Sequence, residues 1–366
     1  MKKPHLTKLM RLTSEINLLL FGLLLIAACS GSSEEMLHWQ EVKNLPEPIS
    51  NNAVASVAAG DSIFVYSFMG ISEGKTYKDI HSKSFKYNVK ENTWRRIEDV
   101  PGDSGRLAAT AATAGGKIYI FGGYTVASDG SETSVPDVYL LDPLTDSFTR
   151  ISKMPVPVDD AVSLVYRDRY IYLISGWHNN DNVKNVQIFD TENYEWQQAT
   201  PFPGPPVFGH AGGIIGNKIV IADGVMVIEG EKEGDRSFSM SPESWMGIIN
   251  SDSLPDIAWK KLPRHPGNSR YRMAAIGDED RIIFAGGSSN PYNYNGIGYN
   301  GESSVPDSSI FAFNLKESSW QELAVAPVAT MDHRSLIKAD GWYYLVGGML
   351  EQQEVGNRVF RFKLNN

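Results

Sequence analysis

Ile118-Tyr119-Ile120-Phe121-Gly122-Gly123 is a short hydrophobic run that ends in two glycines. A run of this kind, closed by a residue pair whose second member is glycine, occurs six times in the chain. The six runs end at Gly70, Gly123, Gly176, Gly224, Gly287 and Gly348. These glycines are 53, 53, 48, 63 and 61 residues apart. Self-similarity at a nearly fixed period is the signature of a repeat protein.

A second marker follows the same period. An aromatic residue opens a short polar stretch once in each repeat, at Trp39, Trp94, Phe148, Trp196, Trp259 and Trp320. The spacings are 55, 54, 48, 63 and 61 residues, close to those of the glycines. Because two independent markers share one period, the sequence predicts six structural repeats.

The residues within each repeat favour strands. Runs rich in β-branched and aromatic side chains suit a strand that is buried on both faces. A glycine pair lets two backbones approach closely where a side chain would clash. A third strand is expected after each variable loop, as in residues 137–142 and 186–190.

A strand that ends in Gly-Gly, repeated at about 50 residues, resembles the kelch repeat, in which four strands form one propeller blade. The resemblance implies an all-β fold, a six-bladed kelch-type β-propeller over residues 37–366. Trp39 marks an outer strand with no blade before it, and the third strand expected at 358–364 has no outer strand after it. We therefore expect residues 38–43 to complete the last blade, so that the N-terminal strand closes the ring and hides both edges.

The N-terminal region indicates export. Lys2, Lys3, Lys8 and Arg11 precede a mostly apolar stretch at 16–28, which is shorter than the roughly 20 residues that a transmembrane helix needs. The sequence Ile26-Ala27-Ala28-Cys29 resembles a bacterial lipobox, and the resemblance implies a signal peptide at 1–28, lipidation of Cys29 and a short tether at 29–36. Ser30 resembles an outer-membrane sorting signal. The alternative is a plain signal peptide cleaved after Ala28.

The charge of the chain excludes one class of function. The net charge is −9, and the first 28 residues hold four basic residues and one acidic residue, so residues 29–366 carry −12. A nucleic-acid-binding protein is expected to carry a basic stripe instead. We expect no nucleic-acid partner, and the charge alone names no other.

Two insertions are candidate ligand-binding loops. The insertion at 225–242 is rich in charged residues, and the insertion at 288–301 alternates tyrosine and asparagine. Tyrosine rings stack on a sugar face while amides hydrogen-bond its hydroxyls. The expected sugar contacts are Tyr292, Asn293, Tyr294, Asn295 and Tyr299. A loop that only packs against itself is the alternative.

The start of each innermost strand is a second candidate site. Six blades would gather these positions around one central mouth. The polar residues found there are Asn52, Arg106, Asp160, His210, Arg272, His333 and Arg334, with Arg270, Tyr271, Trp177 and His178 nearby. Arginines favour a ligand that carries a carboxylate, such as an acidic sugar. The alternative is a ring of residues that only caps the channel.

No cofactor is expected. His178, His210, His265 and His333 fall in different repeats without a close-spaced ligand pair, which disfavours a metal site. The chain also resembles galactose oxidase propellers, whose copper cofactor needs a cysteine cross-linked to a tyrosine. Cys29 is the only cysteine and belongs to the lipobox, so copper oxidase chemistry is excluded.

The repeat number and phase also resemble the exported bacterial N-acetylneuraminate epimerases, most closely at 283–287 and the Tyr/Asn-rich insertion. That family's proposed catalytic pair is a Glu directly after a blade-four Asn-Gly and an Arg six residues later. Here Asp223-Gly224 is followed by Val225, and the nearest substitutes are Glu231 and Arg236. The resemblance implies Glu231 as base, with Arg236 or Arg272 orienting a carboxylate.

Three classes of function remain open. The first is a cofactor-free carbohydrate isomerase that resembles a sialic acid mutarotase. The others are a non-catalytic glycan-binding protein and a protein-interaction propeller. The expected location is the cell envelope, with a lipid anchor at Cys29 in the outer membrane facing the periplasm, while the oligomeric state and the ligand stay unassigned.

Overall fold

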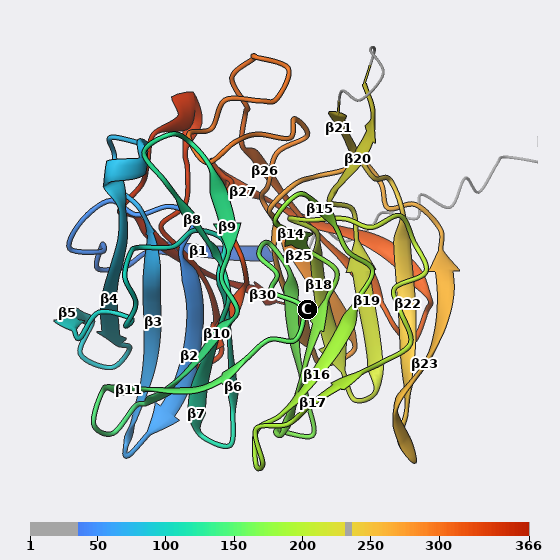
Figure 1. Cartoon of the computed structure of the whole chain (residues 1–366), viewed down its shortest axis with the longest axis horizontal. Helices are drawn as coiled ribbons and strands as arrows, with labels where there is room; N and C mark the ends of the chain where they lie inside the picture. The colour runs from blue at the N-terminus through green and yellow to red at the C-terminus, as the bar shows by residue number, and fades with distance from the viewer. Residues whose placement is uncertain (1–35, 231–235, 366) are drawn as a thin grey trace, which may run out of the picture. The chain divides into compact units, whose positions relative to one another are not determined.

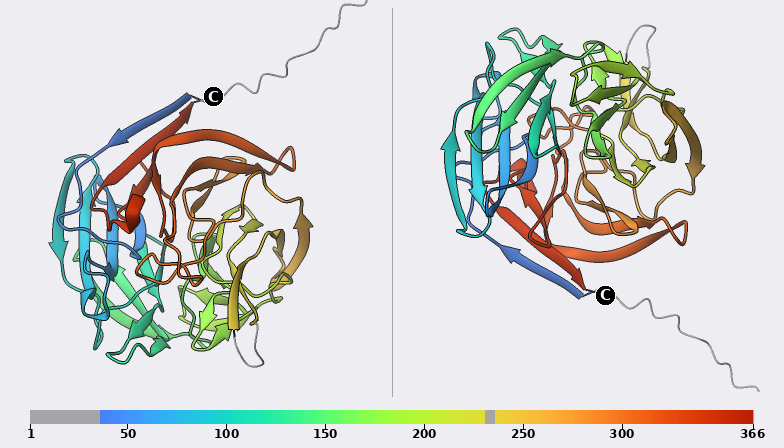
Figure 2. Two further views of the ribbon diagram at one scale, coloured as in Figure 1. Left: turned by 90° about the horizontal axis from the view of Figure 1, so that it is seen from above. Right: turned by 90° about the horizontal axis from the view of Figure 1, so that it is seen from below.

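The computed structural model describes residues 36–230 and 236–365, and within these ranges the chain forms six four-stranded antiparallel sheets. The sheets are the six blades of a β-propeller arranged around one axis (Figure 2). The first three blades are built, from the axis outward, as follows: β2 (Ala53–Ala59), β3 (Ser62–Ile71), β4 (Ile80–Asn88) and β5 (Thr93–Ile97); β6 (Thr110–Ala114), β7 (Lys117–Phe121), β10 (Asp137–Asp142) and β11 (Ser147–Lys153); β12 (Val162–Tyr166), β13 (Tyr170–Ile174), β16 (Val186–Asp190) and β17 (Trp196–Gln198).

The last three blades follow the same order. They are β18 (Ala211–Ile215), β19 (Lys218–Ala222), β22 (Ser244–Asn250) and β23 (Ser253–Leu262); β24 (Ala274–Asp278), β25 (Arg281–Ala285), β26 (Asp307–Asn314) and β27 (Ser319–Thr330); β28 (Ile337–Ala339), β29 (Trp342–Val346), β30 (Val359–Asn365) and β1 (Met36–Glu41). The predicted six-bladed, all-β fold is confirmed.

The N-terminal strand closes the ring, as predicted. β1 pairs antiparallel with β30, and Trp39 lies opposite Phe362 in the register. Figure 2 shows the two ends of the described chain side by side in the last blade. The strand begins two residues earlier than the expected 38–43, because its pairing already starts between Met36 and Asn365.

The aromatic marker of each repeat has a clear role. The indole of Trp94 in blade one donates to the Lys43 carbonyl (2.8 Å), which follows the outer strand of blade six. The indole of Trp320 in blade five donates to the Pro263 carbonyl (2.7 Å), which follows blade four. Each contact joins one blade to the preceding blade, so the recurring aromatic residue marks a repeated interface between blades.

The glycine at the end of each second strand is required by a close approach. Gly123 has φ +83°, and a Cβ there would lie 2.6 Å from the Leu107 carbonyl oxygen. Gly348 has φ +90°, and its Cβ would lie 2.7 Å from the Met331 oxygen. Both distances are too short for a Cβ atom. The carbonyl oxygen of the chain segment that leads into the inner strand therefore leaves room only for glycine at the end of the second strand.

Three extra hairpins stand between the second and third strands of blades two, three and four. They are β8 (Tyr124–Val126) with β9 (Glu132–Ser134), β14 (Trp177–His178) with β15 (Asp181–Asn182), and β20 (Val225–Glu229) with β21 (Arg236–Met240). In blade five the long segment between β25 and β26 takes their place. In Figure 1 that segment, in orange, and β20–β21 rise at the same end of the molecule.

Two short 3-10 helices of the described residues lie in the corresponding connections of the other blades. They are η1 (Tyr77–Asp79) and η2 (Glu351–Gln353). No helix in the described ranges is long and apolar enough to cross a bilayer.

Candidate functional site

Six equivalent residues, one from each blade, surround the axis where the inner strands begin. Each adopts a left-handed backbone conformation, with φ between 48° and 69°: Asn51, Ala108, Asp160, Gly209, Arg272 and Asp332. This conformation is strained for a residue with a side chain and persists only where the surroundings enforce it. Here backbone hydrogen bonds run from blade to blade, for example from Asp160 N to Ala108 O (3.0 Å) and from Arg272 N to Gly209 O (2.7 Å).

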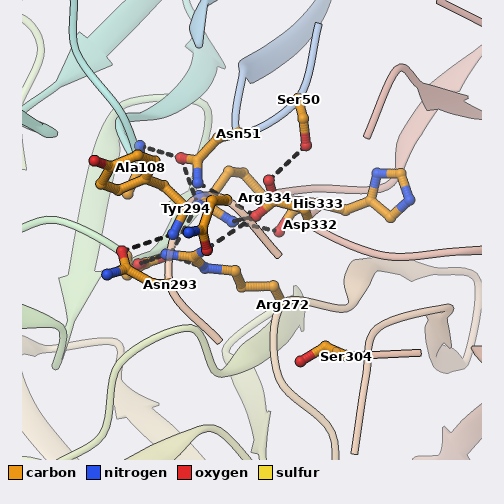
Figure 3. Close-up of polar contacts among 12 residues, drawn as sticks. Ser50, Asn51, Ala108, Arg272, Asn293, Tyr294, Ser304, Asp332, His333 and Arg334 are labelled. Carbon is orange, nitrogen blue, oxygen red and sulfur yellow. Dashed lines mark hydrogen bonds and ion pairs between the residues drawn. The ribbon is translucent and has the colours of Figure 1, made fainter. Parts of the chain in front are cut away.

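The left-handed turn aims the polar side chains of this ring at one another. Arg272 donates from Nε and Nη2 to the two oxygens of Asp160 (3.1 and 2.6 Å) and from Nη1 to Asp332 (3.1 Å). Arg334 lies 3.1 Å from Asp160 and 3.5 Å from Asp332, and it donates to the Asn51 amide oxygen (2.7 Å). Figure 3 shows Arg272, Arg334, Asn51 and Asp332 of this axial network, together with the Ser50 hydroxyl that donates to Asp332.

The axial network is charge-balanced and buried. The four charged side chains are at most 4% exposed. Burial alone would raise the pKa of Asp160, but the charges of Arg272 and Arg334 outweigh it and hold that pKa below its usual value. Burial lowers the pKa of Arg272, but the negative charge of Asp160 outweighs this effect. The pKa of Arg272 is therefore raised above its usual value. Two carboxylates therefore face two guanidinium groups across the axis.

A pocket lies directly above the axial network, on the side of blades two, three and four. Its volume is about 100 Å³. Its polar lining consists of Glu132, Asp159, Asp160, Arg272 and Asn293, and its aromatic lining of Tyr124, Trp177, Phe208, Phe238 and Tyr299. The three hairpins supply Tyr124, Glu132, Trp177 and Phe238, so these insertions form its wall.

Two carboxyl groups of the pocket have raised pKa values. Asp159 is buried, and burial together with the neighbouring charge of Asp160 raises its pKa well above the usual value, although the Ser134 hydroxyl donates to it (2.7 Å). Desolvation also raises the pKa of Glu132, against the opposing charge of Arg272, while the side chain still reaches solvent at the rim. The pocket thus pairs a buried carboxyl whose pKa is raised well above the usual value with a second carboxyl at the rim whose pKa is also raised.

Aromatic rings form the upper wall. The rings of Tyr299 and Phe238 stack with centroids 4.0 Å apart, which joins the blade-five insertion to the blade-four hairpin. Trp177 packs against Phe208 with centroids 5.3 Å apart. A rim of this kind gives a sugar ring an apolar face to stack on.

The blade-five insertion covers the part of the mouth next to blades five and six. Tyr292 is fully buried, and its ring lies 5.3 Å from the Arg272 guanidinium carbon. Tyr294 packs beside Ala108 and Tyr124, and the Asn293 and Asn295 amide oxygens accept backbone hydrogen bonds within the loop. Of the five expected sugar contacts in this insertion, Asn293 and Tyr299 line the pocket.

The predicted ring residues divide into two groups. The structure brings Asp160, Arg272 and Arg334 together at the axis. Tyr271 packs against Phe208 and Tyr292, with its ring 4.5 Å from the Arg272 guanidinium carbon. Arg106 and Arg270 bond to their own blades instead: Arg106 donates to the Gly122 carbonyl (3.1 Å) of blade two, and Arg270 to the Ser309 hydroxyl (2.9 Å) of blade five.

The remaining predicted residues lie outside the pocket lining. His210 donates to the Ile174 carbonyl (2.9 Å), and His333 lies buried beside Gly348. Arg236 is exposed, lies over the Trp177 ring at 5.9 Å and donates to the Asn180 carbonyl. Glu231 lies outside the described residues, as does Cys29 with the signal and tether segments. The described residues hold no cluster of three or more potential metal ligands.

Sequence reasoning missed four polar residues of this region, namely Asn51, Glu132, Asp159 and Asp332. Asn51 and Asp332 directly precede Asn52 and His333, which were chosen by counting back from the glycine pairs. Asn51 and Asp332 each follow the residue whose carbonyl oxygen contacts the glycine at the end of the second strand. An alignment of the repeats on that residue would have assigned both to the ring.

A second cavity, of about 270 Å³, occupies the axial channel below the network. Inner strands of all six blades line it with mostly small and aliphatic side chains, and Arg334 lies at its boundary with the network. Because Asp160, Arg272 and Asp332 lie between the two cavities, the pocket and the channel are separate candidate sites.

The fold and the glycine and tryptophan pattern define a kelch-repeat propeller. The chain belongs to this family: the model described as the KLHDC2/KLHL20/DRC7 Kelch-repeats domain matches residues 31–224.

Among curated proteins, the chain is 25% identical over 357 residues to the N-acetylneuraminate epimerase of Pasteurella multocida (strain Pm70), covering 83% of this chain and 87% of that protein. It is 25% identical over 272 residues to N-acetylneuraminate epimerase 1 of Escherichia coli O6:H1, covering 62% and 68%. It is 22% identical over 311 residues to human Kelch domain-containing protein 1, covering 74% and 68%.

A solved structure titled "Structure of YjhT" superposes with a TM-score of 0.68 at 17% identity, covering 86% of this chain and 95% of that one, which shows a shared fold. The chain is therefore a kelch propeller distantly related to the N-acetylneuraminate epimerases.

Proposed function

We propose that this chain is a cofactor-free carbohydrate mutarotase that interconverts the anomers of a sugar in the pocket above the axial network. The observation that carries the proposal is the pairing of Asp159 with Glu132 in one pocket under an aromatic rim. The distant relationship to N-acetylneuraminate epimerases supports a carbohydrate ligand.

Mutarotation needs one acid and one base around the anomeric centre. Glu132 takes the proton of the anomeric hydroxyl while Asp159 gives its proton to the ring oxygen. The bond between the anomeric carbon and the ring oxygen breaks, and the open-chain carbonyl compound forms. After the carbonyl turns its other face to the returning hydroxyl, reverse proton transfers close the ring and restore both carboxyl groups.

The pKa shifts suit these roles. Burial keeps Asp159 protonated above the usual range of a carboxyl, so it serves as the acid. The raised pKa of Glu132 makes its carboxylate a stronger base, while its solvent contact lets protons exchange. These assignments differ from the sequence-based prediction of Glu231 and Arg236. Arg236 donates to the Asn180 carbonyl and is not among the residues that line the pocket, and Glu231 lies outside the described residues.

The pocket accepts only part of a monosaccharide. With a volume of about 100 Å³, it takes the anomeric end of the ring, while the rest of the sugar lies against Trp177 and Tyr299 at the rim. A glycan-binding protein without turnover is the second candidate, because the aromatic rim alone suffices for binding.

We further propose that the protein is exported and held in the outer membrane, facing the periplasm, by lipid attached to Cys29. The basic start, the short apolar stretch at 16–28 and the single cysteine support this location. Metabolic labelling with a radioactive fatty acid should label the wild-type chain and leave Cys29→Ser unlabelled. Equal labelling of both would reject the anchor.

The activity is tested by NMR with freshly dissolved single anomers of galactose, glucose and N-acetylneuraminate. The wild-type protein should speed the approach to equilibrium of at least one sugar over the buffer blank. Asp159→Asn and Glu132→Gln should each lose about 100-fold or more of that acceleration, whereas Glu98→Gln, which changes an exposed carboxylate elsewhere, should retain it. Sugar binding without acceleration would favour the glycan-binding alternative.

A further inference from the structure

We infer that the pocket selects an uncharged sugar and discriminates against sugars that carry a carboxylate. This inference rests on the proposed function and assigns its substrate class. It departs from the expectation, drawn from the arginines in the sequence, that the ligand is an acidic sugar.

The first reason is that Arg272 already pairs with two buried carboxylates, which use three of its five N–H groups. Its Nε and Nη2 are bound to Asp160, and its Nη1 is bound to Asp332. A guanidinium recognises a carboxylate by presenting two parallel N–H groups to it. Here Asp160 already occupies the Nε and Nη2 edge and Asp332 is bound to Nη1, so a ligand carboxylate would compete with two buried aspartates for this cation.

The second reason concerns Arg334. Its guanidinium is held by Asp160 and Asn51 and lies next to Asp332. It borders the axial channel and is not among the residues that line the pocket. The second axial cation therefore adds no free positive charge to the pocket.

The third reason is the balance of charge in the lining. Among the described residues that line the pocket, the charges of Asp160 and Arg272 cancel in their ion pair, and Asp159 serves as a protonated acid in the proposed function. The carboxylate of Glu132 is then the charge of the lining that has no counter-ion. A ligand carboxylate would add another negative charge in a partly desolvated site, where like charges repel more strongly than in water. Hydroxyl groups can donate to the same carboxyl oxygens, so the lining fits an uncharged polyol.

Arg236 is the cation to consider at the rim. It lies over the Trp177 ring and donates to the Asn180 carbonyl, and its side chain is exposed to solvent. Solvent and salt screen an exposed charge of this kind. The exposed Arg236 therefore adds only a weak attraction for an acidic sugar at the rim.

Matched sugar pairs test the inference with the full-length protein. Galactose and galacturonate, and glucose and glucuronate, differ only in the oxidation of C6 to a carboxylate, and N-acetylneuraminate carries its carboxylate on the anomeric carbon. We expect dissociation constants for the acids at least about tenfold higher than for their neutral partners, equivalent to ~1.4 kcal/mol. Added salt should narrow the gap.

Two variants test whether Glu132 causes the weaker binding of acidic sugars. Glu132→Gln, at the exposed rim, should weaken the discrimination by improving acid binding, whereas Glu98→Gln should leave the gap unchanged. An acid that binds as tightly as its neutral partner overturns the inference and leaves mutarotase activity intact. Failure of every sugar, neutral or acidic, to bind overturns both the inference and the proposed function.

Discussion

Arg272 and Asp160 form a bidentate ion pair across the propeller axis, with Nε–Oδ1 and Nη2–Oδ2 distances of 3.1 and 2.6 Å, although they are 112 residues apart in sequence. The pair joins blade five to blade three beneath the pocket. Both residues sit in left-handed turns that direct their side chains inward. The same contact therefore stabilises the ring and neutralises the cation that lines the pocket.

Replacing Arg272 with alanine leaves Asp160 and Asp332 buried with Arg334 as their remaining cation. Breaking a buried, hydrogen-bonded pair costs about 3–5 kcal/mol, so Arg272→Ala should lower the free energy of unfolding by this amount in urea titrations. Arg95→Ala removes a 58% exposed arginine from its ion pair with Asp146, and should cost less than about 1 kcal/mol. Equal losses in the two variants would contradict a structural role for the axial network.

Closure of the ring depends on Trp39, whose ring packs against Phe360 and Phe362 at 5.1 and 5.8 Å. Trp39→Ala should therefore destabilise the protein by on the order of 3 kcal/mol. His38→Ala on the exposed side of the same strand should have little effect. Thermal unfolding of both variants gives the comparison, and a stable Trp39→Ala protein would argue against closure by β1.

Acid should destabilise the protein through its buried histidines. Burial lowers the pKa of His210 to about 4, from 6.5 in the unfolded chain. Between these values the unfolded chain binds a proton that the folded protein does not, so stability falls as the pH drops from 6.5 to 4. The loss is up to about 3 kcal/mol for this residue.

The variant His210→Asn should therefore lose less stability than the wild type over that pH range. Urea unfolding at pH 6.5, 5 and 4 measures the difference. His38→Asn, an exposed position, should follow the wild-type curve. A His210→Asn curve parallel to that of the wild type would show that His210 does not titrate in this way.

The stacked rings of Tyr299 and Phe238 at the pocket rim should contribute more to sugar binding than to the stability of the fold. Tyr299 is 40% exposed and stacks on Phe238 above the pocket. Tyr299→Ala should raise the dissociation constant of a bound sugar by about tenfold, because a stacking face worth about 1 kcal/mol or more is lost. Tyr194 has the same exposure and stacks on Phe189 away from the pocket, so Tyr194→Ala is the matched control for titration calorimetry.

The sequence predicted the architecture because the fold is periodic. A glycine forced by a carbonyl contact and a tryptophan that reaches the preceding blade recur in the repeats, and both leave a visible mark in the sequence. Closure of the ring by the N-terminal strand was predicted from the order of the markers alone. Trp39 marks an outer strand that has no blade before it in the sequence. The start of β1 differed by two residues because pairing extends to the end of β30.

The site was only partly predictable. Asp160, Arg272 and Arg334 were found because polar residues stood before small apolar strands. Arg106 was grouped with them, but it lies two positions before the left-handed residue Ala108 and donates to the Gly122 carbonyl of its own blade. Glu132 left no periodic signal, since its position depends on how the β8–β9 hairpin folds over the mouth.

The most direct test of the central claim is a crystal structure of the protein soaked with an uncharged monosaccharide. Sugar density above the axial network, with the anomeric oxygen or ring oxygen within hydrogen-bond distance of Asp159 and a face of the ring against Trp177, is the predicted result. A sugar bound in the axial channel beside Ser163, or on another surface with the pocket empty, would contradict the proposed site.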